Sequence, residues 1–404
     1  MKSFQIPDFY RSPLISAIKS ARKNADKMKK DFTPTRLDFG PLEIFLARHF
    51  GFCYGVENAI EIAFRTVDEN PGKRIFLLSE MIHNPQVNAD LQKNGVSFIM
   101  DTKGRILTPW ENLNADDIVI IPAFGTTLET EQKLRQIGID PLKYNTTCPF
   151  VEKVWNRSEQ IGTKGHTIII HGKPDHEETR ATFSHSSVHA PALVIRDMQE
   201  AQLLAEYITR KKSSASFFID FEGQYSADFN PELHLQFIGV VNQTTMLASE
   251  TQGIADYLKG VIMQQFGETE NHFADTRDTL CYATNDNQSA VQGMLSTDAD
   301  LAIVIGGYNS SNTSHLVELC EKKLPTYYIE NQDNISADGS IRHYDFHQNQ
   351  EKNTKDFLPQ SAKTRILISS GASCPDAIVE KVIQKLQGFY AHSRPMSELI
   401  AQFE

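Results

Sequence analysis

Short apolar runs alternate with amphipathic stretches along the chain from Glu43 onward. The short runs are rich in β-branched residues, which is the pattern of buried strands. They predict strands over Glu43–Arg48, Ile75–Leu78, Val96–Ile99, Ile118–Pro122, Thr167–His171, Ala192–Arg196, Gln236–Val241, Leu301–Ile305, Thr326–Ile329 and Arg365–Ser369. Helical spacing of apolar positions predicts helices over Val56–Val67, Pro85–Asn94, Thr126–Ile137, Phe150–Gly162, Thr245–Gln264, Asn285–Ser296, Ser311–Lys323 and Pro375–Leu386. This alternation predicts an α/β fold with mainly parallel sheets.

Three further segments depart from this alternation. The polar stretches Lys211–Asn230 and Gln332–Lys363 are predicted to be surface insertions. Residues 1–30 carry a local excess of basic side chains and a short apolar repeat at near-helical spacing. We interpret them as a solvated helix that leads into the first domain; the alternative is a transit peptide or an arm for an acidic partner.

The overall charge excludes some classes of partner. The chain has 404 residues, with 40 basic and 51 acidic side chains and a formal net charge of −11. Such a chain lacks the positive field that binds nucleic acid or anionic membranes, so we expect neither as a partner. No apolar stretch approaches the roughly 18 residues of a transmembrane helix. The length predicts two or three domains.

The five cysteines are odd in number and widely spaced, which does not indicate a disulfide framework. They favour a reducing, cytoplasmic compartment. Three of them, Cys53, Cys148 and Cys281, each open a predicted helix and are 95 and 133 residues apart. We interpret this as three α/β modules that each supply one thiol to a shared centre.

A helix N-terminus favours the thiolate, which is the form that binds metals. Soft thiolates select iron–sulfur clusters, zinc or copper(I). Each cysteine taken alone could instead be a small buried residue at a turn. Cys320 fits that packing role, whereas Cys374 also begins a predicted helix.

Hydroxyl and amide donors follow two of the predicted strands. Ser310, Ser311 and Asn312 lie in a glycine-containing segment between a buried strand and a helix, and residues 369–373 repeat the arrangement. Such a segment is an anion site without fixed positive charge, suited to phosphate, although it is not a nucleotide P-loop. Either segment could also serve only as a helix cap.

Histidine and carboxylate side chains cluster at further strand ends. His83 lies beside a helix start, His176 and Glu178 follow the strand over residues 167–171, and Gln243 and Thr244 end another strand. An imidazole can donate to phosphate, and a partly desolvated glutamate can retain a proton for delivery. The alternative is a solvated helix start. Ligands of α/β sheets bind at the carboxyl ends of strands, where all these residues are predicted to lie.

The ordered set of motifs resembles the 4-hydroxy-3-methylbut-2-enyl diphosphate reductase family, in its plant and cyanobacterial branch. The matching motifs are residues 51–56, 82–87, 146–149, 176–179, 243–245, 281–284, 309–312 and 371–373. The resemblance covers roughly residues 43–387. It implies a reduction that expels the hydroxyl of an allylic diphosphate as water, giving isopentenyl or dimethylallyl diphosphate in the last step of the non-mevalonate isoprenoid pathway.

The resemblance also implies a cofactor, a site and partners. Three similar α/β domains would form a trefoil around one 4Fe–4S cluster, carried by Cys53, Cys148 and Cys281, with one open iron that binds the substrate hydroxyl. The implied substrate-binding residues are His83, His176, Gln243, Thr244, Ser310, Ser311, Asn312 and Ser373. Glu178 would supply the proton, with Thr244 relaying it. The implied electron donor is a ferredoxin or a flavodoxin.

The predicted boundaries follow the three modules. We expect an N-terminal extension over residues 1–42, α/β domains over 43–148, 149–277 and 278–390, and a C-terminal tail over 391–404. Two departures from the family pattern stand out. Phe124 replaces a histidine that many members have, so that phosphate contact is expected to be lost or moved to His171. The family often has alanine at Cys374, which argues against a fourth thiol ligand.

Two other classes of function compete with the reductase. One is a different three-cysteine 4Fe–4S enzyme of similar trefoil build, such as quinolinate synthase; the motifs around His83 and Asn312 weigh against it. The other is a non-enzymatic redox sensor or electron carrier. That role explains the thiols but not the convergent donors or Glu178.

Overall fold

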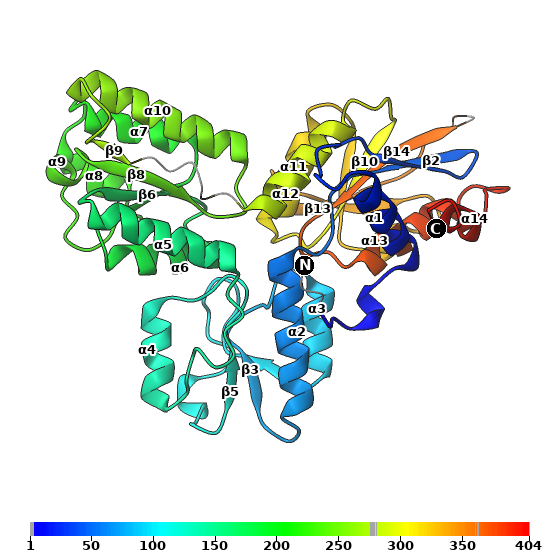
Figure 1. The fold of residues 1–404 in the computed structure, drawn as a ribbon, viewed down its shortest axis with the longest axis horizontal. Helices are drawn as coiled ribbons and strands as arrows, with labels where there is room; N and C mark the ends of the chain where they lie inside the picture. Colours follow the sequence, from blue (N-terminus) through cyan, green and yellow to red (C-terminus); the bar gives the residue numbers. More distant parts are fainter. Residues whose placement is uncertain (1–3, 275–278, 280, 360, 362, 404) are drawn as a thin grey trace. The chain divides into compact units, whose positions relative to one another are not determined.

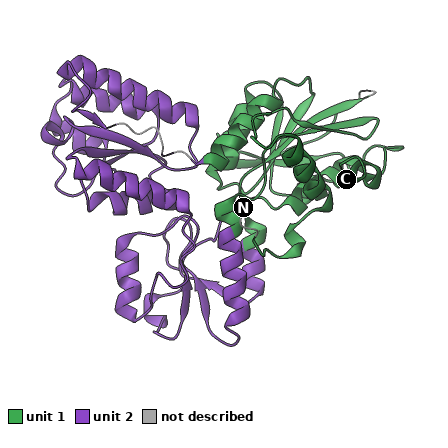
Figure 2. Ribbon diagram, in the orientation of Figure 1, with its two compact units in different colours: residues 1–57, 83–87, 282–404 green, residues 58–82, 88–281 purple. Residues whose placement is uncertain are grey.

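The fold was analysed in a computed structural model that describes residues 4–274, 279, 281–359, 361 and 363–403 (Figure 1). The chain divides into two compact units, coloured green and purple in Figure 2. Unit 1 consists of residues 1–57, 83–87 and 282–404, and unit 2 consists of residues 58–82 and 88–281. Each unit is described separately.

Unit 1 is built on a five-stranded sheet. Its strands are, in spatial order, β1 (Thr35–Asp38), β2 (Leu42–Leu46), β14 (Thr364–Ser370), β10 (Leu301–Ile305) and β11 (Thr326–Ile329). β1 is antiparallel to β2, and the other neighbours are parallel. A separate antiparallel pair joins β12 (Ile341–Asp345) and β13 (Gln350–Thr354). β10 is buried along its whole length, as expected of a central parallel strand.

The helices of unit 1 come from both ends of the chain. They are η1 (Asp8–Tyr10), α1 (Pro13–Ala25), α11 (Tyr282–Met294), α12 (Ser311–Glu321), η3 (Gln332–Asn334), α13 (Asp376–Gln387) and α14 (Met396–Ile400). α1 packs against α13 and α14. The N-terminal helix is therefore confirmed, but its prediction as a solvated helix is wrong, because Leu14, Ile15 and Ile18 are buried.

Unit 2 holds two parallel sheets. One has the order β4 (Val96–Phe98), β3 (Ile75–Leu77), β5 (Ile118–Ile120), and the other β7 (Ala192–Ile195), β6 (Thr167–His171), β8 (Ile238–Asn242), β9 (Phe273–Ala274). Its helices are η2 (Trp110–Asn112), α4 (Leu128–Ile137), α5 (Pro149–Thr163), α6 (Glu177–Ser187), α7 (Met198–Ile208), α8 (Ser214–Asp220), α9 (Pro231–His234) and α10 (Ala248–Phe266). Both α2 (Tyr54–Glu69) and α3 (Pro85–Lys93) begin in unit 1 and continue into unit 2.

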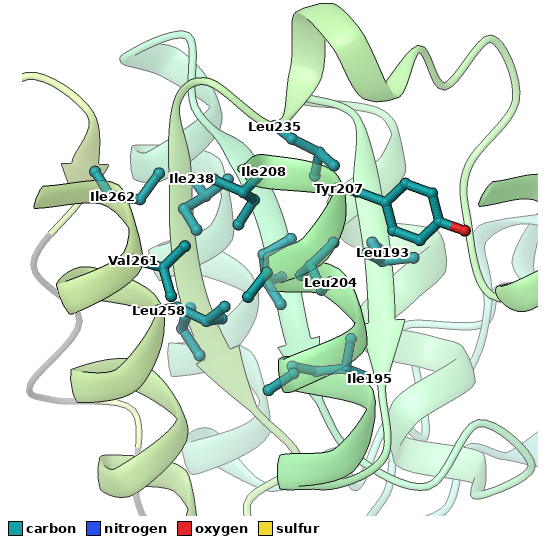
Figure 3. Packing of buried hydrophobic residues seen from close by; sticks show 14 of the residues in the cluster. Leu193, Ile195, Leu204, Tyr207, Ile208, Leu235, Ile238, Leu258, Val261 and Ile262 are labelled. Carbon is teal, nitrogen blue, oxygen red and sulfur yellow. The ribbon is translucent and has the colours of Figure 1, made fainter. Parts of the chain in front are cut away.

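Helices cover both faces of the four-stranded sheet. Ile169 of β6 points into a core shared with α7 and α10, part of which Figure 3 shows. Ile168 and Ile170, its neighbours along the strand, point into a second core with Val154 and Ile161 of α5. Side chains along a strand point alternately to the two faces of the sheet. When both faces are buried, successive residues of a central strand must therefore be apolar, which gives a continuous apolar run in the sequence. This arrangement fixes β6 and β8, and hence the loops that follow them.

The α/β class with mainly parallel sheets is confirmed. The prediction that residues 211–230 form a surface insertion is wrong in part, because this segment contains α8 and buries Phe217, Phe221 and Phe229 in the core. The stretch 332–363 carries η3 and the β12–β13 pair. The three-domain division stays a prediction, and its boundary between residues 277 and 278 lies outside the described residues. Within the described chain, no helix is both long and apolar enough to cross a membrane.

Candidate functional site

In unit 1, the start of α12 meets the ends of β10 and β14. Ser310 caps α12, and its Oγ accepts hydrogen bonds from the Thr313 backbone N–H at 3.2 Å and from the Thr313 hydroxyl at 3.0 Å. A Cβ on Gly306 would lie 2.4 Å from Thr313 Oγ1, and one on Gly371 only 2.0 Å. Only glycine therefore allows the two strand ends to close around Thr313.

Asn312 links the same two strand ends. Its Oδ1 accepts a hydrogen bond from the Ala372 backbone N–H at 2.8 Å, which fixes the amide so that Nδ2 is its free end. Nδ2 is buried and has no partner among the described residues. A buried donor without an acceptor costs about 1–3 kcal/mol. Asn312 therefore presents a donor that a bound acceptor would satisfy.

His83 and Cys53 lie against the same strand ends. The Ser373 hydroxyl donates to the His83 carbonyl at 3.1 Å, and a Cβ on Gly307 would lie 2.5 Å from that carbonyl oxygen. The Cys53 backbone N–H donates to the Ala372 carbonyl at 3.2 Å. Unit 1 thus brings together a set of predicted site residues: Cys53, His83, Ser310, Ser311, Asn312 and Ser373.

Unit 2 places a carboxylate between two neighbouring strand ends. Glu178, in the first turn of α6 after β6, is only 1% exposed. Thr244 follows β8 and donates to both carboxylate oxygens of Glu178, through its backbone N–H to Oε1 and through its hydroxyl to Oε2 at 2.9 Å. β6 and β8 are parallel neighbours, which is why residues 66 positions apart meet here.

His176 caps the helix on which Glu178 lies. Its Nδ1 accepts a hydrogen bond from the Glu178 backbone N–H at 3.1 Å. The neutral imidazole therefore carries its proton on Nε2, which makes Nε2 a donor. The Phe124 ring meets the His176 ring edge-on, with centroids 5.6 Å apart, and so helps to orient it.

Two other predicted residues have protein partners. The Gln243 Oε1 accepts from the Lys173 backbone N–H at 3.1 Å and from the Thr179 hydroxyl at 3.0 Å, while Nε2 donates to Thr245 Oγ1 at 2.6 Å. These bonds tie together the loops after β6 and β8, and the substrate contact of Gln243 stays a prediction. His171 is fully buried, with Nδ1 2.9 Å from the Thr251 hydroxyl of α10, so its imidazole is used to pack that helix.

Three cysteines stand at helix starts, as predicted. Cys53 directly precedes α2, Cys148 caps α5, and Cys281 directly precedes α11. Cys53 and Cys148 are half-buried, and Cys281 is buried. Cys53 belongs to unit 1, whereas Cys148 and Cys281 belong to unit 2. Within the described residues, no group of three or more histidine, cysteine or acidic side chains forms a metal site.

The remaining two cysteines are fully buried. Burial raises the pKa of the Cys320 thiol to about 12 and the pKa of the Cys374 thiol far above its ordinary range. Both therefore stay protonated near neutral pH, whereas a metal ligand must be a thiolate. Full burial thus counts against Cys320 and Cys374 as metal ligands.

Sequence reasoning missed a buried pair beside Cys281. The Thr279 hydroxyl donates to Asn242 Oδ1 at 2.7 Å, and Asn242 Nδ2 donates to the Gln243 carbonyl at 2.9 Å. Asn242, at the end of β8, thus anchors the chain two residues before Cys281. The sequence feature that could have indicated this pair is Asn242 itself, a polar residue at the end of an otherwise apolar strand.

Comparisons with known proteins show which proteins the chain is similar to. The model of the LytB protein family matches residues 44–387. The chain is 40% identical over 354 residues to the 4-hydroxy-3-methylbut-2-enyl diphosphate reductase of Synechococcus sp. (strain WH7803), covering 87% of this chain and 86% of that protein. It is 39% identical over 380 residues to the same-named protein of Synechococcus sp. (strain RCC307), covering 93% and 88%.

Two solved structures share the fold. The first is (E)-4-hydroxy-3-methyl-but-2-enyl diphosphate reductase, the terminal enzyme of the non-mevalonate pathway, with a TM-score of 0.51 and 24% identity over 85% of this chain and 99% of that one. The second is the E-1-hydroxy-2-methyl-but-2-enyl-4-diphosphate reductase from Plasmodium falciparum, with a TM-score of 0.61 and 19% identity over 84% and 86%. The resemblance inferred from the ordered motifs is confirmed.

Proposed function

The chain belongs to the LytB protein family, and from this premise we propose that it reduces 4-hydroxy-3-methylbut-2-enyl diphosphate to isopentenyl and dimethylallyl diphosphate. This is the last step of the non-mevalonate pathway. The observation that supports it most directly is the buried Glu178 carboxylate, held through both oxygens by Thr244. A carboxyl group out of water beside a hydroxyl is suited to deliver a proton to a departing oxygen.

The diphosphate would be bound by neutral donors. In unit 1 these are the hydroxyls of Ser310 and Ser311, the amide Nδ2 of Asn312 and the imidazole of His83. The Ser373 hydroxyl would join them by turning from the His83 carbonyl to which it donates. In unit 2 the donor is Nε2 of His176, set by the hydrogen bond at Nδ1. Donors at a helix N-terminus bind an anion through backbone and side-chain N–H and O–H groups without a fixed charge.

The donor chemistry of the chain fits one 4Fe–4S cluster. We assign its ligands to Cys53, Cys148 and Cys281, which all stand at helix starts, whereas Cys320 and Cys374 are fully buried. Three thiolates leave one iron open, and when bound the cluster supplies a Lewis acid for the substrate hydroxyl and a path for two electrons. A ferredoxin or flavodoxin would supply these electrons in a reducing, cytoplasmic compartment.

For the proton chemistry we propose residues of unit 2. Two electrons and two protons convert the substrate into product and one water. Glu178 would protonate the leaving hydroxyl, and the Thr244 hydroxyl, 2.9 Å from Glu178 Oε2, would orient that hydroxyl and pass the proton on.

An anaerobic assay tests the proposal. Cluster-loaded enzyme with reduced methyl viologen and the hydroxylated diphosphate should yield both five-carbon diphosphates. Cys53→Ser should lose the cluster absorbance near ~400 nm and the activity, because a serine hydroxyl is a poor ligand for this soft site. The matched control, Cys320→Ala, should keep both. Absence of turnover by the cluster-loaded enzyme would contradict the proposal.

A further inference from the structure

Residues 4–25 contact the loop of residues 50–54, which we call the Cys53 loop. The Tyr10 ring meets the Phe52 ring edge-on, with centroids 5.8 Å apart. The Phe4 ring meets the Tyr54 ring in the same manner at 4.9 Å. Phe4 and Tyr10 are themselves buried. Both sequence neighbours of Cys53 are therefore packed against aromatic rings from the N-terminal segment.

α1 contacts the two residues that precede Phe52. The Lys19 ammonium donates to both carboxylate oxygens of Asp376, at 2.8 and 3.0 Å, and lies 4.8 Å from the centre of the Phe50 ring. Gly51 has a φ of +77°, and a Cβ there would lie 2.5 Å from Asp376 Oδ1 and 3.2 Å from Lys19 Nζ. The Lys19–Asp376 ion pair therefore packs against the backbone of the Cys53 loop at Gly51.

The segment that makes these contacts is itself firmly held. Ser12 caps α1 by accepting from the Ile15 backbone N–H at 2.9 Å, and its hydroxyl donates to Glu380 of α13. The Arg11 guanidinium donates to the Phe4 carbonyl at 3.0 Å, which ties the start of the segment to η1 and α1. α1 runs beside α13 in unit 1 (Figure 1). Residues 4–25 are therefore a packed part of the unit.

The opposite side of the Cys53 loop is held by the strand end that carries the donor set. The Cys53 backbone N–H donates to the Ala372 carbonyl at 3.2 Å, and the Cys53 carbonyl accepts from the Glu57 backbone N–H at 2.9 Å. The family model begins at residue 44, so the contacts from residues 4–25 come from outside the part that it matches.

We propose that residues 4–25 fix the conformation of the Cys53 loop, and that Tyr10 and Lys19 are positioning residues for the Cys53 thiol. A ligand on a loop must be held by surrounding contacts to keep a productive geometry, because loops otherwise open locally at low free-energy cost. The inference rests on the proposed function only where it treats Cys53 as a cluster ligand. The loop conformation itself can be measured without the cluster.

Hydrogen exchange of the full-length chain tests the positioning role. Tyr10→Ala and Lys19→Met should each raise the exchange rate of the amides of residues 51–54 by roughly fivefold or more, since each removes packing worth about 1 kcal/mol. The matched control is Lys23→Met, which removes an exposed lysine on the same helix. Equal exchange in all four proteins would overturn the proposal. If Tyr10→Ala fails to fold, the comparison of Lys19→Met with Lys23→Met still tests the proposal.

Iron retention separates this inference from the proposed function. With an iron chelator present, Lys19→Met should lose iron several-fold faster than wild type, and Lys23→Met should match wild type. Faster loop exchange with unchanged iron loss would refute the positioning of the ligand. Retention of the full cluster by Cys53→Ser would instead refute the ligand assignment in the proposed function.

Discussion

At the scale of single residues, the proposed role of Glu178 as proton donor can be tested by one substitution. Glutamine at this position can keep both contacts, since its Oε1 accepts from the Thr244 N–H and the Thr244 hydroxyl can accept from its Nε2. Glu178→Gln should therefore fold and bind the cluster while losing the transferable proton, and kcat should fall by roughly 100-fold or more. Anaerobic steady-state kinetics and iron analysis measure both effects. Turnover close to wild type would place the proton source elsewhere.

Asn312 tests the neutral donor set. Asn312→Asp preserves the acceptor for the Ala372 N–H but replaces the Nδ2 donor by an anionic oxygen that would face the diphosphate. We expect KM for the substrate to rise by roughly tenfold or more, and the melting temperature to fall because the new carboxylate is buried. Asn285→Asp, at an exposed position of α11, adds the same charge and is the control. Equal KM values for the two variants would exclude Nδ2 as a diphosphate donor.

The half-buried histidine His49 makes the stability of the folded state depend on pH. Burial, joined by the charges of Arg48, Lys29 and Arg22 and opposed by Asp26, lowers its pKa from 6.5 to about 4. As pH falls below 6.5 the unfolded chain binds a proton that the folded chain binds only near pH 4, so the stability of the folded state decreases across this window. The urea midpoint should therefore fall from pH 7 to pH 5, and His49→Gln should fall less. An identical fall in the variant would assign the effect to other groups.

At the scale of elements, the apolar pattern predicted the central strands but not the polar or exposed ones. β6 and β10 have the predicted bounds, because a strand covered on both faces carries a continuous apolar run. β11, at the other edge of its sheet, also has the predicted bounds, since its tyrosines and isoleucine are typical of strands. β1, at the sheet edge, and the β12–β13 pair were missed, since half-solvated strands of polar residues carry no comparable signal. α8 was missed because its apolar residues lie in a polar segment.

The aromatic residues of α8 give a prediction at this scale. Phe217 is fully buried and stacks on Phe229 with centroids 5.1 Å apart, whereas the neighbouring Phe218 is 39% exposed. Phe217→Ala should lower the free energy of unfolding of unit 2 by about 3–5 kcal/mol, because it leaves a cavity in the core. Phe218→Ala should lower it by no more than about 1 kcal/mol. Urea denaturation measures the free energy of unfolding of both variants. A loss in Phe217→Ala as small as that in Phe218→Ala would show that α8 contributes little to stability.

At the scale of the whole molecule, the sequence predicted which polar residues lie at strand ends and helix starts better than which residues support them. Glu178 and Asn312 could be selected as candidates because polar residues at helix starts after apolar strands form a local pattern. The Asn242–Thr279 pair and the packing of Tyr10 on Phe52 join segments that are 37 and 42 residues apart, so only the folded chain reveals them. The N-terminal segment shows the same difference, since its basic residues suggested solvent exposure while its three apolar residues set its packing.

The net charge gives the last prediction. The chain carries −11, yet the proposed ligand is an anion, and the proposed diphosphate donors are hydroxyl, amide and imidazole groups without a lysine or arginine among them. Short-range hydrogen bonds to neutral donors are little affected by salt, whereas contacts with fixed cations weaken as salt screens them.

With reduced methyl viologen as the electron donor, kcat/KM for the diphosphate should therefore change by less than about twofold between about 20 and about 200 mM NaCl. Any change should be an increase, because salt also screens the repulsion between the acidic chain and its anionic substrate. A steep loss of kcat/KM with the viologen would mean that lysine or arginine side chains hold the diphosphate and that the neutral donor set is incomplete.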